Sequence, residues 1–293
     1  MTKNQANLFY KTNKMEQIEK DCFINTTKDL SYPPVAISLG EKLLKSRQGD
    51  QLVPIPIGTY GSFSFIQSAP KTYKTFFISL LASVYLSGKN NFGGNIRGHR
   101  NGRCLLHFDT EQGKWHCQRV FKRVLDMNKE YERGCYHTYS LRTLAPRTRI
   151  EFIEHCLKTK NNIGCCIIDG IADLCNDVNN IEEANAVIQK LMEWTENYNI
   201  HIITVIHSNF GSDKPTGHLG SFLEKKTETQ IQLEANTVNK GWVTVKCKRS
   251  RGYAFETFSF EVNELGLPTI VNAYYDPLSS YGRKKYGAVI QEE

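Results

Sequence analysis

The chain has 293 residues and a formal net charge of +7, from 37 Lys and Arg against 30 Asp and Glu. Apolar residues make up 40% of it, enough for a buried core. No apolar run reaches the roughly 20 residues of a membrane-spanning helix, and no secretory signal is visible, so we expect a cytoplasmic protein with no membrane partner. The mildly basic charge permits nucleic-acid binding without showing it. Nine scattered cysteines without a CxxC pair favour reduced core thiols over disulfides or zinc.

The first 50 residues are polar and weakly periodic, which predicts an N-terminal arm with one short helix. Within this arm, Glu41 to Ser46 are compatible with a further helix. We expect one α/β domain over residues 51–272. Residues 273–293 predict an irregular tail with a basic Arg283-Lys284-Lys285 run.

Strand-like and helix-like segments alternate through the expected domain. The expected strands are short and apolar or aromatic, and cover residues 62–67, 104–108, 136–141, 164–168 and 201–206. Four helices are expected. They cover residues 76–86, a segment around residues 115–125, a segment that starts at Pro146, and residues 181–198. The second has one apolar face with Trp115, Val120, Phe121, Val124 and Leu125, and the fourth has one with Ala184, Val187, Ile188, Leu191 and Met192. This alternation predicts a mostly parallel sheet flanked by helices. Residues 229–233, 242–248 and 257–262 predict antiparallel strands added at one edge.

The segment Ser68-Ala-Pro-Lys-Thr-Tyr-Lys-Thr75 joins the first expected strand to a buried helix. Its end matches the P-loop pattern of Gly, four residues, Gly-Lys and Ser or Thr, but Ser68 and Tyr73 stand at the glycine positions. In such a loop Lys74 would reach the outer phosphates and Thr75 would bind magnesium, while backbone N–H groups face the phosphates. Lys71 offers an additional cation. An ordinary helix start remains the alternative, because Tyr73 occupies a position that favours glycine.

Polar side chains end or follow three later strands. Asp169 ends an apolar strand, as does the acid that holds the magnesium shell in P-loop NTPases, although acids at strand ends are common. Glu111 could deprotonate an attacking water, or complement the dipole of the helix that follows. His207 could sense a γ-phosphate, or be a hydrogen-bonded core residue. Open α/β sheets bind ligands at the carboxyl ends of their strands, so we expect these residues near the phosphate loop.

Two loops carry basic side chains. Residues 211–221 form a Gly-rich segment with Lys214 and His218, which predicts a long loop that contacts a nucleic-acid backbone or is disordered. Residues 88–103 predict a flexible basic loop with Arg97 and Arg100, either for phosphate contacts or as a plain linker.

One of the late strands ends in a basic cluster, Lys246-Cys-Lys-Arg249-Ser-Arg251. Arg249 and Arg251 could act as arginine fingers that complete the site of a neighbouring subunit. They could also contact phosphodiesters, or only protect a sheet edge from pairing.

Five stretches in this order resemble RecA-like ATPases of the replicative-helicase and RepA-type helicase branch. They resemble more closely the AAA family ATPases of Bacteroides-type mobile elements. The stretches are residues 65–77, 106–113, 166–174, 205–209 and 217–221, and the resemblance spans about residues 35–270.

The resemblance implies a RecA-like P-loop NTPase core that binds ATP and Mg²⁺. It implies Lys74 and Thr75 on phosphate and magnesium, Asp169 as the acid of the magnesium shell, Glu111 as catalytic base, His207 as sensor, and Arg249 and Arg251 as arginine fingers of a neighbouring subunit. It also implies a homo-oligomeric ring such as a hexamer, and single-stranded DNA as a partner. We therefore expect a helicase-like or replication and mobilisation ATPase. A non-hydrolysing nucleotide- or DNA-binding accessory protein is the alternative, favoured by the missing glycines. A small-molecule kinase fits the basic cluster less well.

Overall fold

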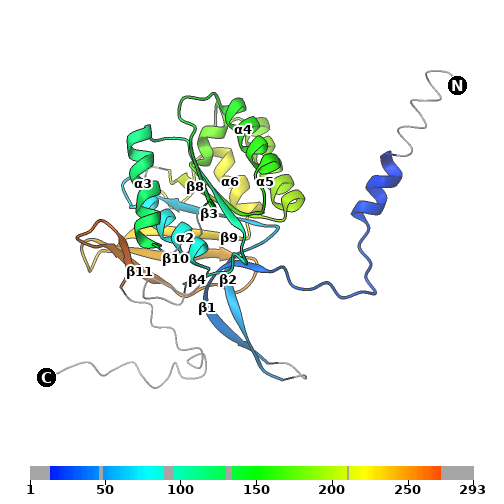
Figure 1. Ribbon diagram of the computed structural model, residues 1–293, viewed down its shortest axis with the longest axis horizontal. Coiled ribbons are helices and arrows are strands. Elements are labelled where there is room, and N and C mark those ends of the chain that lie inside the picture. The colour runs from blue at the N-terminus through cyan, green and yellow to red at the C-terminus, as the bar shows by residue number, and fades with distance from the viewer. Residues whose placement is uncertain (1–13, 46–48, 89–95, 130–133, 210, 272–293) are drawn as a thin grey trace. The chain divides into compact units, whose positions relative to one another are not determined.

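The computed structural model describes residues 14–45, 49–88, 96–129, 134–209 and 211–271. The chain forms two compact units, Met1–Pro33 and Pro34–Glu293. In the first unit, residues 14–22 form the short helix that the sequence predicts. The second unit contains the α/β domain (Figure 1).

The second unit is built on a nine-stranded sheet with the order β12-β11-β10-β9-β3-β8-β7-β5-β6. Its parallel part consists of β9 (Thr229–Ala235), β3 (Phe63–Ser68), β8 (His201–His207), β7 (Ile163–Asp169), β5 (Cys104–Asp109) and β6 (Tyr136–Ser140). The strands β10 (Trp242–Ser250), β11 (Phe258–Val262) and β12 (Pro268–Ile270) extend this sheet in antiparallel fashion. Strands β3, β5 and β7 are buried along their whole length, as expected for parallel strands covered on both faces. The predicted fold class is confirmed.

Helices cover both faces of this sheet (Figure 1). One face packs against α2 (Lys74–Ser87) and α3 (Lys114–Met127), and the other against α4 (Pro146–Thr159), α5 (Ile181–Tyr198) and α6 (Gly217–Lys226). A short 3-10 helix, η1 (Ile171–Leu174), follows β7. Local signals set the helix starts: Pro146 is the first residue of α4, and the Asn180 side chain caps α5 by accepting hydrogen bonds from two backbone N–H groups. No helix in the described part of the chain is both long and apolar enough to cross a bilayer.

A second, three-stranded antiparallel sheet has the order β2-β1-β4, with β1 at Val35–Leu44, β2 at Gln51–Thr59 and β4 at Ile96–Gly98. Here the helix predicted from Glu41 is wrong, because β1 continues to Leu44 and Glu41 to Leu44 pair with β2; Ser46 lies outside the described residues. The second unit therefore starts at Pro34, inside the segment predicted to be a polar arm. Part of the loop predicted over residues 88–103 is β4, and residues 89–95 lie outside the described residues.

Three further predictions need correction. Strand β9 is parallel to β3, not antiparallel, because α6 forms a crossover between β8 and β9. Since α6 begins at Gly217, the loop predicted over residues 211–221 is shorter and His218 is helical. Trp115 and Met192, predicted on apolar faces, are 60% and 36% exposed. The predicted tail, with its Arg283-Lys284-Lys285 run, lies outside the described residues.

All nine cysteines are free thiols, and seven of them are buried. The seven buried thiols therefore pack in the core as small hydrophobic side chains do.

Candidate nucleotide site

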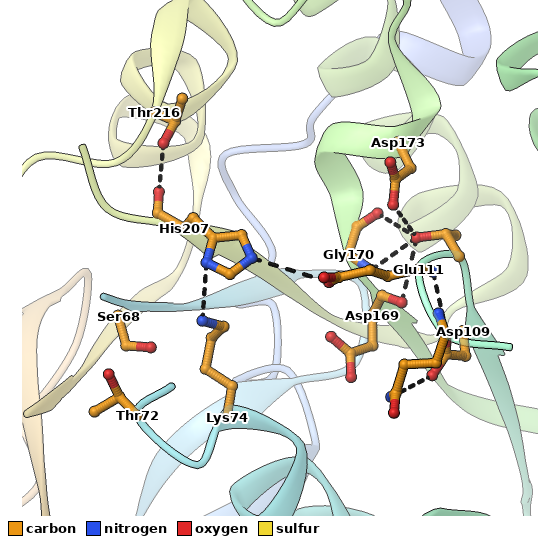
Figure 2. A network of polar contacts seen from close by, with 12 residues as sticks. Ser68, Thr72, Lys74, Asp109, Glu111, Asp169, Gly170, Asp173, His207 and Thr216 are labelled. Atoms are coloured by element: carbon orange, nitrogen blue, oxygen red, sulfur yellow. Dashed lines mark hydrogen bonds and ion pairs between the residues drawn. The ribbon is translucent and has the colours of Figure 1, made fainter. Parts of the chain in front are cut away.

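The carboxyl ends of β3, β5, β7 and β8 border one cleft of about 500 Å³. Six of the residues that the sequence assigns to a nucleotide site line it: Lys71, Lys74, Thr75, Glu111, Asp169 and His207. Figure 2 shows that the side chains of Lys74, Glu111, Asp169 and His207 come from separate parts of the chain and lie together beside the N-terminal end of α2. Ser68 is buried at the end of β3, directly before the loop. The fold thus brings the predicted phosphate, base and sensor residues together.

The loop between β3 and α2 turns at two residues with left-handed backbone conformation, Lys71 (φ 63°) and Tyr73 (φ 56°). This conformation costs a non-glycine residue about 1–2 kcal/mol, so Tyr73 stands where glycine would be unstrained. Two hydrogen bonds to the Ala69 carbonyl stabilise the loop: one from the Thr72 hydroxyl at 2.6 Å, and one from Lys74 Nζ at 3.2 Å. The loop keeps a left-handed turn at the second glycine position without the glycine.

Lys74, His207 and Glu111 form a polar chain across the cleft (Figure 2). Lys74 Nζ lies 3.0 Å from Nδ1 of His207, and Nε2 of His207 lies 3.9 Å from a carboxylate oxygen of Glu111. A lysine ammonium can only donate, so Nδ1 accepts, and the proton of a neutral ring is on Nε2, facing Glu111. The His207 ring, and next the Lys74 ammonium, lower the pKa of Glu111, which keeps this carboxylate ionised.

Glu111 is fixed by the residue at the end of β5. One carboxylate oxygen of Asp109 accepts hydrogen bonds from the backbone N–H of Glu111 (3.1 Å) and of Gln112 (2.7 Å), and the other accepts from the Gln112 side chain (2.7 Å). Helix α3 begins only at Lys114 and has no acid in its first turn. Glu111 therefore does not complement the dipole of that helix, and its side chain faces the cleft.

Asp169 is buried at the end of β7. Burial, together with the nearby Asp109 and Glu111 carboxylates, raises the pKa of Asp169 to about 7. Burial also lowers the pKa of Lys74. Within the described residues no group donates a hydrogen bond to the Asp169 carboxylate, so a divalent cation would relieve this arrangement of acids. A buried carboxylate and the Thr75 hydroxyl are oxygen donors of the kind that Mg²⁺ prefers, and both fit that ion.

A second group of bonds connects β5 with the end of β7, and sequence reasoning missed it. The Thr110 hydroxyl accepts a hydrogen bond from the Gly170 N–H (2.9 Å) and donates to a carboxylate oxygen of Asp173 (2.7 Å). These bonds fix the turn that carries Asp169 (Figure 2). Only the position of Thr110 after a strand end, between Asp109 and Glu111, could have indicated this role.

His207 is also hydrogen-bonded to the start of α6. The His207 carbonyl accepts hydrogen bonds from the backbone N–H of Thr216 (3.0 Å) and from its hydroxyl (2.8 Å). Lys214 precedes this contact and His218 follows it in the first turn of α6, and both side chains are exposed. The predicted DNA-contacting residues of this segment are thus one short connection away from His207.

The four predicted arginines do not reach the cleft within one chain. Ser250 of β10 pairs with Thr229 of β9, which pairs with Ser64 near the amino end of β3; Arg249 and Arg251 therefore lie at the end of the sheet opposite the cleft. Both are exposed, and Arg251 donates to the Lys226 carbonyl at 2.8 Å. Arg97 and Arg100, the predicted DNA-contacting pair, lie in and just after β4. The His99 carbonyl between them accepts a hydrogen bond from the Tyr60 hydroxyl, and Tyr60 lies just before the amino end of β3, so this pair also lies toward the end opposite the cleft.

A helix that starts at Lys74 and Thr75 directly after a buried strand, with acidic and histidine side chains at the neighbouring strand ends, is the arrangement of a P-loop nucleotide-binding fold. Residues 48–213, more than half of the chain, match the family described as an AAA domain, and the chain belongs to this family. The family and the fold support nucleotide binding by a RecA-like ATPase.

Two solved structures share the fold. The crystal structure of the RadB recombinase aligns with a TM-score of 0.52 at 16% identity, covering 72% of this chain and 91% of that one. A KaiC-like protein from the hyperthermophilic archaeon Pyrococcus horikoshii OT3 aligns with a TM-score of 0.52 at 14% identity, covering 73% and 91%. At these identities the likeness concerns the fold alone. No curated protein sequence matches the chain.

Proposed function

We propose that this protein is a DNA-associated, Mg²⁺-dependent ATPase that works as a homo-oligomer, in a helicase-like, replication or mobilisation role. The observation that carries the proposal is the alignment of Lys74, His207 and Glu111 across one cleft that also contains the buried Asp169. Free thiols throughout the chain fit a cytoplasmic location.

In this proposal each side chain has one task. The start of α2 and Lys74, with Lys71 and Ser68 beside them, bind the phosphates, because backbone N–H groups and cations favour anions there. Thr75 and Asp169 hold Mg²⁺, which neutralises phosphate charge when bound. Glu111 accepts the proton of the attacking water, since its carboxylate is ionised and points into the cleft.

His207 connects chemistry to movement in this scheme. Its Nδ1 contacts the same Lys74 Nζ that would bind the outer phosphates, and its carbonyl holds Thr216. Bound phosphate would compete for Lys74, so the ring of His207 would reorient with nucleotide state and shift the segment with Lys214 and His218. These two residues, with Arg97 and Arg100 as a separate basic surface, are the proposed contacts to single-stranded DNA.

Arg249 and Arg251 require a second copy of the chain. They lie at the opposite end of the sheet from their own cleft, so they can contribute charge to a cleft only in an adjacent subunit. A ring, such as a hexamer, would repeat that contact, and it would place ATP between subunits.

One observation favours a second candidate, a nucleotide-binding accessory protein without turnover. The phosphate loop has left-handed residues at Lys71 and Tyr73 and no glycine between Ser68 and Thr75. The strain of such a loop could leave phosphate binding intact while misplacing the outer phosphate relative to Glu111.

The experiment is a steady-state ATPase assay with and without oligo(dT), on wild type and on Lys74→Ala. If the protein is an ATPase, wild type should hydrolyse ATP and DNA should stimulate this turnover. Lys74→Ala should lower turnover by at least about 100-fold, which is the usual effect of losing one electrostatic contact to the transferring group. Wild type that hydrolyses no faster than Lys74→Ala, but still binds ATP in a titration, would establish the accessory role instead.

A further inference from the structure

Three glutamines are buried in the sheet, where packing alone would favour apolar residues. Gln67 and Gln230 are fully buried and Gln232 is 7% exposed. Gln67 is the residue of β3 directly before the phosphate loop, and Gln232 is its register partner on β9. A buried amide is costly unless its groups are hydrogen-bonded, so these side chains need a specific reason to be there.

All three amides belong to one network that ends on the β8–α6 loop, here residues 208–209 and 211–216. Gln67 Nε2 donates to the Ser208 hydroxyl (3.0 Å) and to the Asp213 carbonyl (2.7 Å). Gln67 Oε1 accepts from Gln230 Nε2 (2.8 Å), and Gln232 Nε2 donates to the Asp213 carboxylate (3.3 Å). Lys248 also donates to the Asp213 carbonyl.

The orientation of the Gln67 amide follows from its partners. The Asp213 carbonyl can only accept, so the NH₂ group of Gln67 must face it, and both hydrogens of this group are used. Gln67 is thus fully engaged only while Ser208 and Asp213 keep these positions. Movement of the β8–α6 loop would leave a buried donor unpaired, which makes the loop position depend on β3.

The same loop is tied to the phosphate loop by a backbone contact. The Ser208 N–H donates to the Ser68 carbonyl at 3.0 Å, so Ser208 contacts both Ser68 and its neighbour Gln67. At the other end of the network, Gln230 Nε2 donates to Glu224 of α6 at 3.1 Å. The network therefore runs from the first residue of the phosphate loop to both the loop and the helix that carry Lys214 and His218.

We propose that Gln67 is a positioning residue that couples the nucleotide cleft to the β8–α6 loop, independently of His207, so that nucleotide and single-stranded DNA change each other's affinity. The inference rests on the proposed function, because it assigns DNA to this loop. A displacement of Ser68 by bound phosphate moves Gln67, and Gln67 moves Ser208 and Asp213. Coupling of this kind is reciprocal: the factor by which DNA changes nucleotide affinity equals the factor by which nucleotide changes DNA affinity.

The test measures that factor directly, as the dissociation constant of a fluorescent non-hydrolysable ATP analogue with and without saturating oligo(dT). The key variant is Gln67→Met, which keeps the approximate volume and removes every hydrogen bond. The matched control is Thr204→Val, another buried and hydrogen-bonded residue on the adjacent strand β8, whose hydroxyl donates to Ile168 and does not contact the loop. Thermal unfolding of both variants reports general destabilisation.

We expect DNA to change the nucleotide affinity of wild type and of Thr204→Val by about tenfold, and that of Gln67→Met by less than about twofold. Without DNA, all three should bind the analogue within about threefold of each other, a difference well under 1.4 kcal/mol. If Gln67→Met does not fold, Ser208→Ala removes the same contact from the loop side and should lower the factor in part.

The outcomes separate the inference from the function beneath it. Equal coupling in wild type and Gln67→Met overturns the inference and leaves the proposed function standing, as does a wild type that binds both ligands without coupling. Wild type that fails to bind the analogue or oligo(dT) overturns the proposed function itself, and the role of Gln67 falls with it.

Discussion

The two ends of strand β8 carry the same residue type in opposite settings. His201, at the amino end, is fully buried; its Nδ1 lies 2.9 Å from the Thr59 carbonyl and its Nε2 lies 2.9 Å from the Ser64 hydroxyl. His207, at the carboxyl end, contacts Lys74 and faces Glu111 with a half-exposed side chain. Both ring nitrogens of His201 have protein hydrogen-bond partners, whereas His207 contacts side chains that a bound ligand would also contact.

Buried acids show the same contrast. Glu228, before β9 near the amino end, accepts hydrogen bonds from the backbone N–H and the hydroxyl of Thr59. Asp169, at the carboxyl end, has neighbouring carboxylates instead of donors, and its pKa is raised to about 7 by burial and by those charges. Burial raises the pKa of Glu228 as well, but the hydrogen bonds from Thr59 oppose that shift, whereas the carboxylates around Asp169 add to it. The acid at the amino end is therefore paired with protein donors, and the acid at the carboxyl end carries a cost that a bound cation would remove.

The largest expected effect comes from Asp169→Asn. Hydrolysis should fall by about 1,000-fold, as one magnesium ligand and its charge are lost. The raised pKa means that the stability conferred by protonated Asp169 is full below the unfolded pKa near 4 and is lost as pH rises through about 7. Asparagine does not ionise, so the variant avoids this loss of stability at high pH. The free energy of unfolding of the nucleotide-free protein should therefore rise by up to about 4 kcal/mol at pH 8 and change little at pH 4.

The matched variant at the other end is Glu228→Gln. The substitution replaces a carboxylate that accepts hydrogen bonds from the N–H and the hydroxyl of Thr59. It should therefore lower the free energy of unfolding by about 1–3 kcal/mol and leave the hydrolysis rate per folded molecule unchanged. Chemical unfolding at pH 4 and pH 8 checks both variants. Destabilisation by Asp169→Asn at pH 8 would contradict the contrast between the two acids.

Glu111→Gln should separate binding from chemistry. Loss of a positioned base lowers turnover by about 100-fold or more, whereas nucleotide affinity should change by less than about threefold. Glu151→Gln, on the exposed face of α4, is the control for loss of one surface carboxylate. ATPase assays and nucleotide titrations on the same preparations measure the two effects. Equal losses in affinity and turnover would show that Glu111 is not the catalytic base.

Exchanging the two histidines for asparagine should give opposite phenotypes. His207→Asn is expected to lower DNA-stimulated turnover by about tenfold at an unchanged melting temperature, since one hydrogen-bond-sized contact is lost at the site. His201→Asn should lower stability by about 1–3 kcal/mol because two buried partners lose their contact. A melting temperature that falls equally in both would show that His207 is also a core residue.

The smallest effect is expected at the phosphate loop. Tyr73→Gly relieves a left-handed residue, which gains about 1–2 kcal/mol, and the greater freedom of glycine in the unfolded chain offsets about half of this gain. The net gain of about 1 kcal/mol should appear as roughly fivefold tighter nucleotide binding or as added stability. Lys71→Gly removes the same strain together with a proposed phosphate contact, so its gain should be smaller. Weaker binding by Tyr73→Gly would mean that the tyrosine ring itself serves the site.

Much of the fold was predictable, because alternating apolar strands and helices leave few alternatives to a covered parallel sheet. The strand ends then bring Lys74, Glu111, Asp169 and His207 together by topology alone. Strand direction at the sheet edge was not predictable, because alternation in residues 229–233 does not distinguish β9, which is parallel, from β10. The position of Arg249 and Arg251 depends on that direction.

The roles of other residues depend on contacts between distant segments. Thr110 acts through a backbone group at the neighbouring strand end, and Gln67 acts through a loop about 140 residues further along the chain. No local pattern in the sequence indicates such pairs. Glu41 to Leu44 illustrate the opposite failure: a segment with helix-compatible residues forms a strand because β2 supplies a partner for each of its residues.

The central claim, that the carboxyl-end cleft is a nucleotide site, is tested most directly by calorimetric titration of MgATP into wild type and Lys74→Ala. Wild type should bind one MgATP per chain, and Lys74→Ala should weaken this binding by at least about 100-fold, or roughly 2.7 kcal/mol. Equal affinity of the two proteins, or no binding by wild type, would contradict it.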